Sequence, residues 1–86
     1  MNIKQLIKIV EIKLKKSIQI GYLKIEDKSY LHKNHKTNEK GKFHLKLTIE
    51  SEELNKLSKV NSMRIIYKIL DEELKKYIHS IQIFIR

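Results

Sequence analysis

Residues 43–86 decide the fold, and they read FHLKLTIESEELNKLSKVNSMRIIYKILDEELKKYIHSIQIFIR. Apolar side chains alternate with polar ones over residues 43–50 and again over residues 78–85, a period of two that is typical of strands with one buried face. Between them, residues 59–76 place apolar side chains at steps of three and four, which predicts one long helix. Ser51, followed by two glutamates, is typical of the start of a short helix before it. Two strands joined by a helical crossover should be parallel, with a right-handed connection.

The residues upstream of this stretch add a helix, a strand and a loop. Residues 3–14 carry a second helical stripe, for which Asn2 is a suitable N-cap. Residues 17–26 alternate apolar and polar side chains around Gly21, which predicts one strand with a bulge or bend at the glycine. Residues 27–42 are polar and predict a long loop, of a kind that is usually functional or disordered. The predicted fold is α/β (α+β) in the order α-β-β-α-α-β, with a three-stranded mixed sheet, its first two strands antiparallel, and helices on one face.

Length and composition bound what such a fold can be. The chain of 86 residues and 10.4 kDa allows one small domain, residues 1–86. It contains no cysteine, which excludes disulfides, thiol catalysis and any metal site built on its own thiolates. No apolar run is long enough to span a bilayer, and residues 1–4 lack the features of a signal peptide. We therefore expect a cytoplasmic protein that does not associate with membranes.

Motifs of enzymes are also absent from the sequence. It has no nucleophile elbow, no glycine-rich phosphate loop and no HExxH sequence. Glu72 and Glu73 are adjacent on a predicted helix, so they point in different directions and should belong to a solvated face. We expect a protein that is not an enzyme.

The positive charge is concentrated in the first half of the chain. Residues 1–46 hold twelve lysines against four acids, a balance of +8, whereas residues 47–86 hold seven cations against six acids, a balance of +1. A basic surface attracts nucleic acid, anionic lipid or an acidic protein partner. The alternative is a genomic bias toward AT-rich codons, because the chain has seventeen lysines, two arginines and fifteen isoleucines.

Several separated motifs keep the same register as those of one known family. They are His44-Leu45-Lys46-Leu47-Thr48-Ile49-Glu50-Ser51, Leu54, Ser58, Val60, Arg64-Ile65-Ile66-Tyr67, Leu70, Glu72-Glu73-Leu74 and Ile78-His79, preceded by Asp27-x-Ser29-x-x-His32-x-x-His35. Together they resemble the BolA-like family from about Ile18 to Ile85. The chain departs from the family at Ser62-Met63-Arg64, where Arg-His-Arg is usual, and at Leu54 and Lys56, where Phe and Gly are usual.

The resemblance implies a role in iron–sulfur handling. BolA-like proteins are partners of monothiol glutaredoxins, with which they share a [2Fe–2S] cluster. The glutaredoxin cysteine and a glutathione thiol ligate one side, while the BolA-like protein supplies a last-strand histidine and a second ligand from the loop between its first two strands. Carried onto this chain, the last-strand ligand is His79 and the loop ligand is His35 or His32. Counting back from His44 favours His35, whereas counting forward from Asp27 and Ser29 favours His32, and His35 is narrowly preferred. The isolated chain should bind no cluster and should be a monomer.

The histidines also have simpler interpretations. His79 shares the parity of Ile81, Ile83 and Ile85, so it could be a histidine at the edge of the core. His32 and His35 could be ordinary solvated loop residues. His44 lies on the polar parity of its strand, and we assign it a supporting role in place of ligation. Imidazole ligands raise the potential of a [2Fe–2S] centre and make the site sensitive to protonation near neutral pH.

DNA binding is the alternative function. The order of elements is like that of a class II KH-like fold, and some family members are regarded as transcriptional regulators. The candidate contacts are Lys33, Lys36, Lys40, Lys42 and Arg64. A KH domain clamps the nucleic-acid backbone with Gly-x-x-Gly, whereas Gly21 and Gly41 are far apart, and the aromatic residues form no evident stacking platform. We therefore expect weak, non-specific DNA binding; a purely structural adaptor is a third possibility.

Overall fold

The computed structural model describes residues 1–29 and 42–86. Its helices and strands are α1 (Ile3–Ser17), β1 (Tyr22–Asp27), β2 (Phe43–Glu50), α2 (Glu52–Asn55), α3 (Lys59–Ile69), α4 (Asp71–Lys76) and β3 (Ile78–Ile85). The sheet order is β1-β2-β3, with β1 antiparallel and β3 parallel to β2. The predicted three-stranded mixed sheet is therefore confirmed. Within the described residues, no helix is long and apolar enough to cross a membrane.

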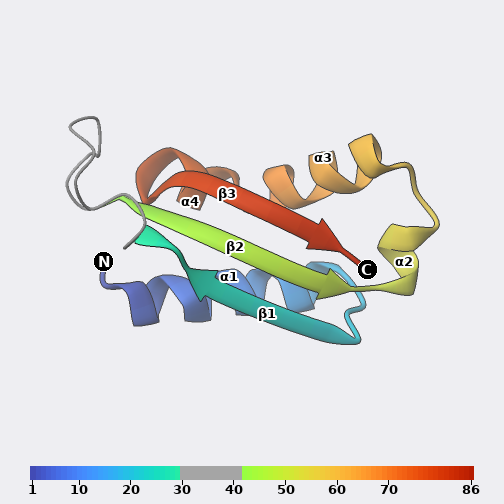
Figure 1. Cartoon of the computed structure of the whole chain (residues 1–86), viewed down its shortest axis with the longest axis horizontal. Helices are drawn as coiled ribbons and strands as arrows, with labels where there is room; N and C mark the ends of the chain where they lie inside the picture. Colours follow the sequence, from blue (N-terminus) through green and yellow to red (C-terminus); the bar gives the residue numbers. More distant parts are fainter. Residues whose placement is uncertain (30–41) are drawn as a thin grey trace.

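One face of the sheet carries the helices and the core. Figure 1 shows α1, α3 and α4 together behind the three strands. Leu45, Leu47 and Ile49 of β2 point to this face and are buried, and they meet apolar side chains from α1 and α3. The buried apolar residues are Leu6, Val10, Leu14, Ile18, Leu45, Leu47, Ile49, Leu54, Ile66, Leu70 and Ile78. The opposite face of the sheet is left open, and we call it the open face.

The first helix begins as predicted but ends later. The Asn2 side chain accepts a hydrogen bond from the Gln5 N–H at 2.8 Å, and the Gln5 side chain accepts one from the Asn2 N–H at 3.1 Å, which forms a capping box. The helix continues to Ser17, and Ile18 caps it with a buried side chain. The predicted strand start at residue 17 is therefore wrong, because Ile18 serves the core from the helix end; β1 begins only at Tyr22, after Gly21.

The predicted long helix over residues 59–76 is in fact two helices. Leu70, with φ −98° and ψ 16°, ends α3 and precedes α4, and its side chain is fully buried. No glycine or proline marks this position. The break lets α4 run in a new direction while Leu70 stays in the core, so tertiary packing overrides the continuous helical period.

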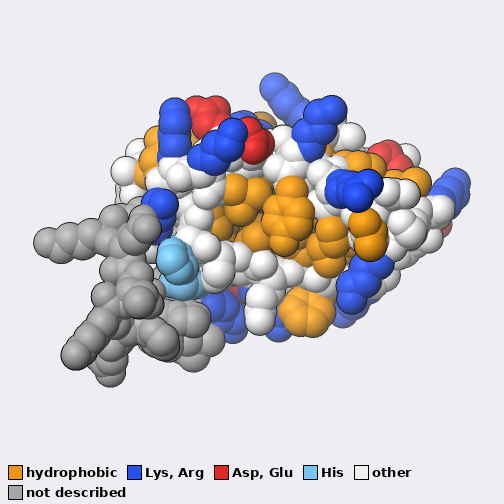
Figure 2. All heavy atoms as spheres, turned by 90° about the horizontal axis from the view of Figure 1, so that it is seen from above, with side chains coloured by type: hydrophobic (Ala, Val, Ile, Leu, Met, Phe, Trp, Pro, Cys, Tyr) orange, Lys and Arg blue, Asp and Glu red, His pale blue; other side chains and the backbone are white. Residues whose placement is uncertain are grey.

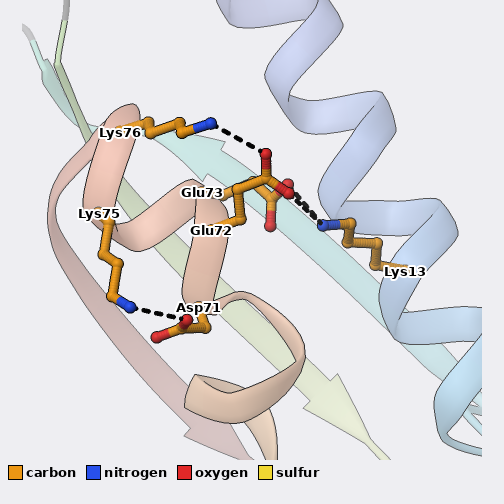
Figure 3. Close-up of polar contacts among 6 residues, drawn as sticks. All are labelled: Lys13, Asp71, Glu72, Glu73, Lys75 and Lys76. Atoms are coloured by element: carbon orange, nitrogen blue, oxygen red, sulfur yellow. Dashed lines mark hydrogen bonds and ion pairs between the residues drawn. The ribbon is translucent and has the colours of Figure 1, made fainter.

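An ion pair joins α4 to α1. The Lys13 Nζ lies 2.7 Å from a carboxylate oxygen of Glu73 and 3.9 Å from one of Glu72 (Figure 3). The Glu73 side chain is only 5% exposed, whereas that of Glu72 is 61% exposed. The expectation of a solvated face is correct for Glu72 and wrong for Glu73, because α4 turns Glu73 toward α1.

Candidate functional site

Two histidines meet at the end of the sheet where β2 and β3 begin. His44 is the second residue of β2, and His79 is the second residue of β3. Their ring centroids are 4.9 Å apart with an interplanar angle of 59°. Because β1 also ends here, at Asp27, all three strands contribute to this corner of the molecule.

A bulge determines the direction of His79. Phe43 pairs with Ile78, but His44 pairs with Ser80, so His79 is the extra residue between two pairs. After the bulge, Ser80 shares the open face with His44, and Ile81 shares the helix face with Leu45. The ring of His79 lies against His44, so the prediction that it shares the isoleucine face is wrong.

The two imidazoles have different environments. His44 is 5% exposed, and its Nδ1 is 2.6 Å from the Ser80 hydroxyl. His79 is exposed. An exposed imidazole can approach a metal on another protein, whereas a buried ring held by a serine acts as packing support. The predicted supporting role of His44 agrees with this geometry.

Short polar contacts attach the end of β1 to the backbone of His44. The His44 N–H donates to the Ser29 hydroxyl at 3.1 Å, and the His44 carbonyl accepts from the Lys28 N–H at 2.7 Å. The Ser29 N–H in turn donates to the Asp27 carboxylate at 2.9 Å. This last contact is an Asx turn, for which Asp-x-Ser is a readable sequence signal. Ser29 belongs to the motif quoted in the sequence analysis, but its supporting role was not predicted, and Ser80 was not identified from the sequence.

The remaining predicted site residues are not brought together by the described part of the chain. His32, His35, Lys33, Lys36 and Lys40 lie outside the described residues. Most of the predicted loop also lies there, although Asp27 belongs to β1. Lys42 immediately precedes β2, whereas Arg64 is in α3 among the helices. Neither the choice between the two loop histidines nor the proposed lysine cluster is therefore tested.

Cations surround the open face next to the histidines. The Nζ atoms of Lys28 and Lys24 lie 3.3 and 3.8 Å from Glu26, which is paired with Lys46 across the sheet. Partial desolvation raises the pKa of Glu26, but the Lys28 hydrogen bond and the charges of Lys24, Lys28 and Lys46 outweigh it and lower the pKa overall. Glu26 thus stays ionised and neutralises only part of this charge, so the face favours an anionic partner.

The donor set suits a metal site that another molecule completes. Among the described residues, no group of three or more His, Cys, Asp or Glu side chains could hold a metal ion. The chain has no thiolate, and among residues 1–29 and 42–86 the exposed imidazole at this corner is that of His79. Such a donor fits the imidazole side of a [2Fe–2S] centre whose thiolates come from elsewhere.

Comparison with known proteins relates this chain to one family. The sequence pattern of the family described as BolA-like protein matches residues 14–86. The DNA-binding transcriptional regulator BolA of Haemophilus influenzae is 36% identical over 73 residues, covering 85% of this chain and 68% of that protein. SufE-like protein 1, chloroplastic/mitochondrial, of Arabidopsis thaliana is 34% identical over 76 residues, covering 83% of this chain but 20% of its own length.

Solved structures agree with the sequence comparison. The BolA domain of SufE1 from Arabidopsis thaliana superposes with a TM-score of 0.79 at 29% identity, covering 100% of this chain and 93% of that domain. BolA1 from Arabidopsis thaliana superposes with a TM-score of 0.76 at 30% identity, covering 90% of this chain and 85% of that structure. The fold and the sequence therefore point to the same group of proteins.

Proposed function

This chain belongs to the BolA-like protein family, and on that premise we propose that it works with a monothiol glutaredoxin and shares a [2Fe–2S] cluster with it through histidine ligands. The cluster is cargo that passes through the complex during iron–sulfur assembly, trafficking or iron regulation. The role is one of binding and not of catalysis. The glutaredoxin cysteine and glutathione supply the thiolates that this chain lacks.

The observation that supports this proposal is the pairing of an exposed His79 with a buried His44 on the open face. The Ser80 hydroxyl fixes the His44 ring, and the His44 ring in turn limits the orientations of His79. An imidazole restrained in this way can meet a docked metal centre with little loss of conformational entropy. The second ligand is His35, or His32, from the segment that leaves this corner at Ser29 and returns at Lys42.

Anaerobic reconstitution tests the proposal. The chain is mixed with a monothiol glutaredoxin, iron, sulfide and glutathione, and visible absorption and circular dichroism are compared with those of the glutaredoxin alone. We expect a distinct spectrum that His79→Ala abolishes. His35→Ala should be milder, because His32 can substitute in the loop, and the double substitution should match His79→Ala.

The matched control is Gln82→Ala, which removes an exposed side chain from the same strand and the same face. It should leave the spectrum unchanged, which separates loss of a ligand from loss of docking area. Far-UV circular dichroism confirms folding of each variant. A folded His79→Ala protein with the wild-type cluster spectrum would contradict the assignment.

DNA binding is a second candidate function, because a relative of 36% identity is named a DNA-binding transcriptional regulator. The cations around Glu26 add a surface that can attract phosphate. The cluster function ranks first because the histidine pair has a specific geometry, whereas surface lysines bind polyanions without specificity.

A further inference from the structure

The outer edge of β3 carries backbone groups that face away from the sheet. In the order β1-β2-β3 this strand is an edge, and its inner side is fixed by the Arg86 N–H donating to the Ile49 carbonyl at 2.8 Å. The backbone groups of successive residues in a strand point to opposite sides, so residues at an odd number of positions from Arg86 direct their N–H and C=O groups away from β2. These residues are Ile81, Ile83 and Ile85. Among the described residues, no hydrogen bond pairs these outward groups.

A groove lined by both apolar and polar side chains runs beside this edge. Ile81, Ile83 and Ile85 point to the helix face, but each remains partly exposed, because α3 and α4 do not cover the edge completely. The groove has a volume of about 330 Å³. Its apolar lining residues are Leu54, Leu57, Met63, Ile83, Phe84 and Ile85, and its polar ones are Asn55, Lys59 and Ser62. Figure 2 shows the side of the molecule on which the β3 edge lies, with hydrophobic side chains gathered in its middle and Lys and Arg side chains around them. A long apolar edge of this kind is a template for another strand.

The charges at the groove select the kind of strand that fits. Lys59 is the one charged side chain among the described residues that line it. On the open face, the Lys46 Nζ lies 4.9 Å from the ring centroid of Phe84, which is 50% exposed at the edge. A second copy of this chain would bring a net charge of +9 against the same charge. The positive charges of Lys59 and Lys46 instead attract an acidic partner.

We propose that the outer edge of β3 binds an extended segment of a partner protein as a fourth strand, with its apolar side chains in the groove and its acidic residues facing Lys59 and Lys46. Backbone hydrogen bonds to Ile81, Ile83 and Ile85 supply affinity, and the groove supplies side-chain specificity. The Ile83–Ile85 segment lies roughly 13–20 Å along the strand from His79. Ile81, at the near end of this surface, lies only about 7 Å along the strand from His79. The two proposals are therefore separated by their tests, because binding of the fourth strand is measured without iron and without glutaredoxin.

The probe is the synthetic decapeptide acetyl-EDVTVTVTDE-amide, which alternates apolar residues between acidic ends. Its control is the same peptide with every Val and Thr amide N-methylated. The N-methylated peptide has no backbone hydrogen-bond donor in its Val-Thr segment, whichever of its two edges faces β3. Binding is followed by amide hydrogen exchange in the iron-free protein without glutaredoxin, so that failure here says nothing about cluster sharing. We expect exchange at Ile81, Ile83 and Ile85 to slow about tenfold or more at saturation. Gln82 and Phe84, whose amides already face β2, should not change.

Substitutions test the charge argument. Lys59→Glu should weaken binding of the decapeptide about two- to fivefold, as expected for one exposed ion pair. A glutamate is also favourable at this first position of α3, so the fold should be retained. Lys8→Glu makes the same change of charge on α1, at a residue that does not line the groove, and should leave the affinity unchanged.

Several outcomes would overturn the proposal. They are no binding at millimolar peptide, equal binding of the N-methylated peptide, and binding without the alternating protection. Protection that rises with protein concentration alone would identify a second copy as the occupant. If oligothymidylate, added in place of the peptide, produced the same slowed amide exchange at Ile81, Ile83 and Ile85, the occupant of the edge would be single-stranded nucleic acid.

Discussion

His44 and His79 differ in burial, and this difference separates their contributions to stability. His44→Ala removes a buried ring and its 2.6 Å hydrogen bond to the exposed Ser80 hydroxyl, so it should lower the free energy of unfolding by about 2 kcal/mol, chiefly through the lost packing. His79→Ala removes an exposed ring and should cost about 1 kcal/mol or less. Urea denaturation followed by far-UV circular dichroism measures both values. Equal losses would show that the two rings share one environment.

The sequence could identify His79 as a candidate but could not give its direction. Strict alternation from Ile81 places it on the isoleucine face, and only the pairing of His44 with Ser80 reveals the bulge. Strand pairing is a tertiary property that one strand's alternation does not encode. Burial of Glu73 was missed for a similar reason, because a helical period shows which residues share a face but not which neighbour covers it.

The contact between α1 and α4 should depend on Glu73 and not on its neighbour. Glu73→Gln weakens the 2.7 Å pair with Lys13 while leaving a buried polar group, so it should cost about 1–2 kcal/mol. This value is below that of a fully buried pair because Lys13 is 36% exposed. Glu72→Gln, at 61% exposure, is the matched control and should change stability by about 0.5 kcal/mol or less. Similar losses in both variants on thermal or urea unfolding would remove the distinction.

The same pair predicts how stability changes at high pH. The hydrogen bond from Lys13 to Glu73 raises the pKa of Lys13 above 10.5, against a smaller opposing effect of desolvation. A raised folded-state pKa means that this stabilisation is fully present below the unfolded-state pKa, near 10.5, and is lost as the pH rises through the folded-state pKa. Wild type should therefore lose more stability than Glu73→Gln above pH 10.5. Parallel profiles of unfolding free energy against pH for the two proteins would contradict this.

The boundaries of the elements show where local sequence signals end. The N-cap at Asn2 and the alternation of β2 are local, and both were predicted correctly. The break at Leu70 has no local signal, because neighbouring residues favour a continuous helix and the core alone decides where it turns. Ile18 likewise has strand-like neighbours but lies in the core as the cap of α1.

For the whole molecule, the net charge of +9 predicts DNA binding that is weak and non-specific. Duplexes of unrelated sequence should bind with similar affinity, and binding should weaken steeply between low and physiological salt. If DNA were the main ligand, replacing Lys33, Lys36, Lys40 and Lys42 by Gln should abolish binding and flatten the salt dependence. Fluorescence anisotropy over a salt series measures both. Nanomolar, sequence-specific affinity at physiological salt would place DNA binding ahead of cluster sharing.

The central claim is that an imidazole of this chain ligates the shared cluster, and isotope-edited pulsed EPR tests it most directly. The chain is labelled with ¹⁵N-histidine, combined with unlabelled glutaredoxin and glutathione, and the reconstituted cluster is reduced to its paramagnetic state. We predict strong ¹⁵N hyperfine couplings from directly bonded nitrogens, and their loss in the His79→Ala protein. A labelled wild-type complex that forms the cluster without such couplings, or a His79→Ala complex that retains them unchanged, would contradict the account.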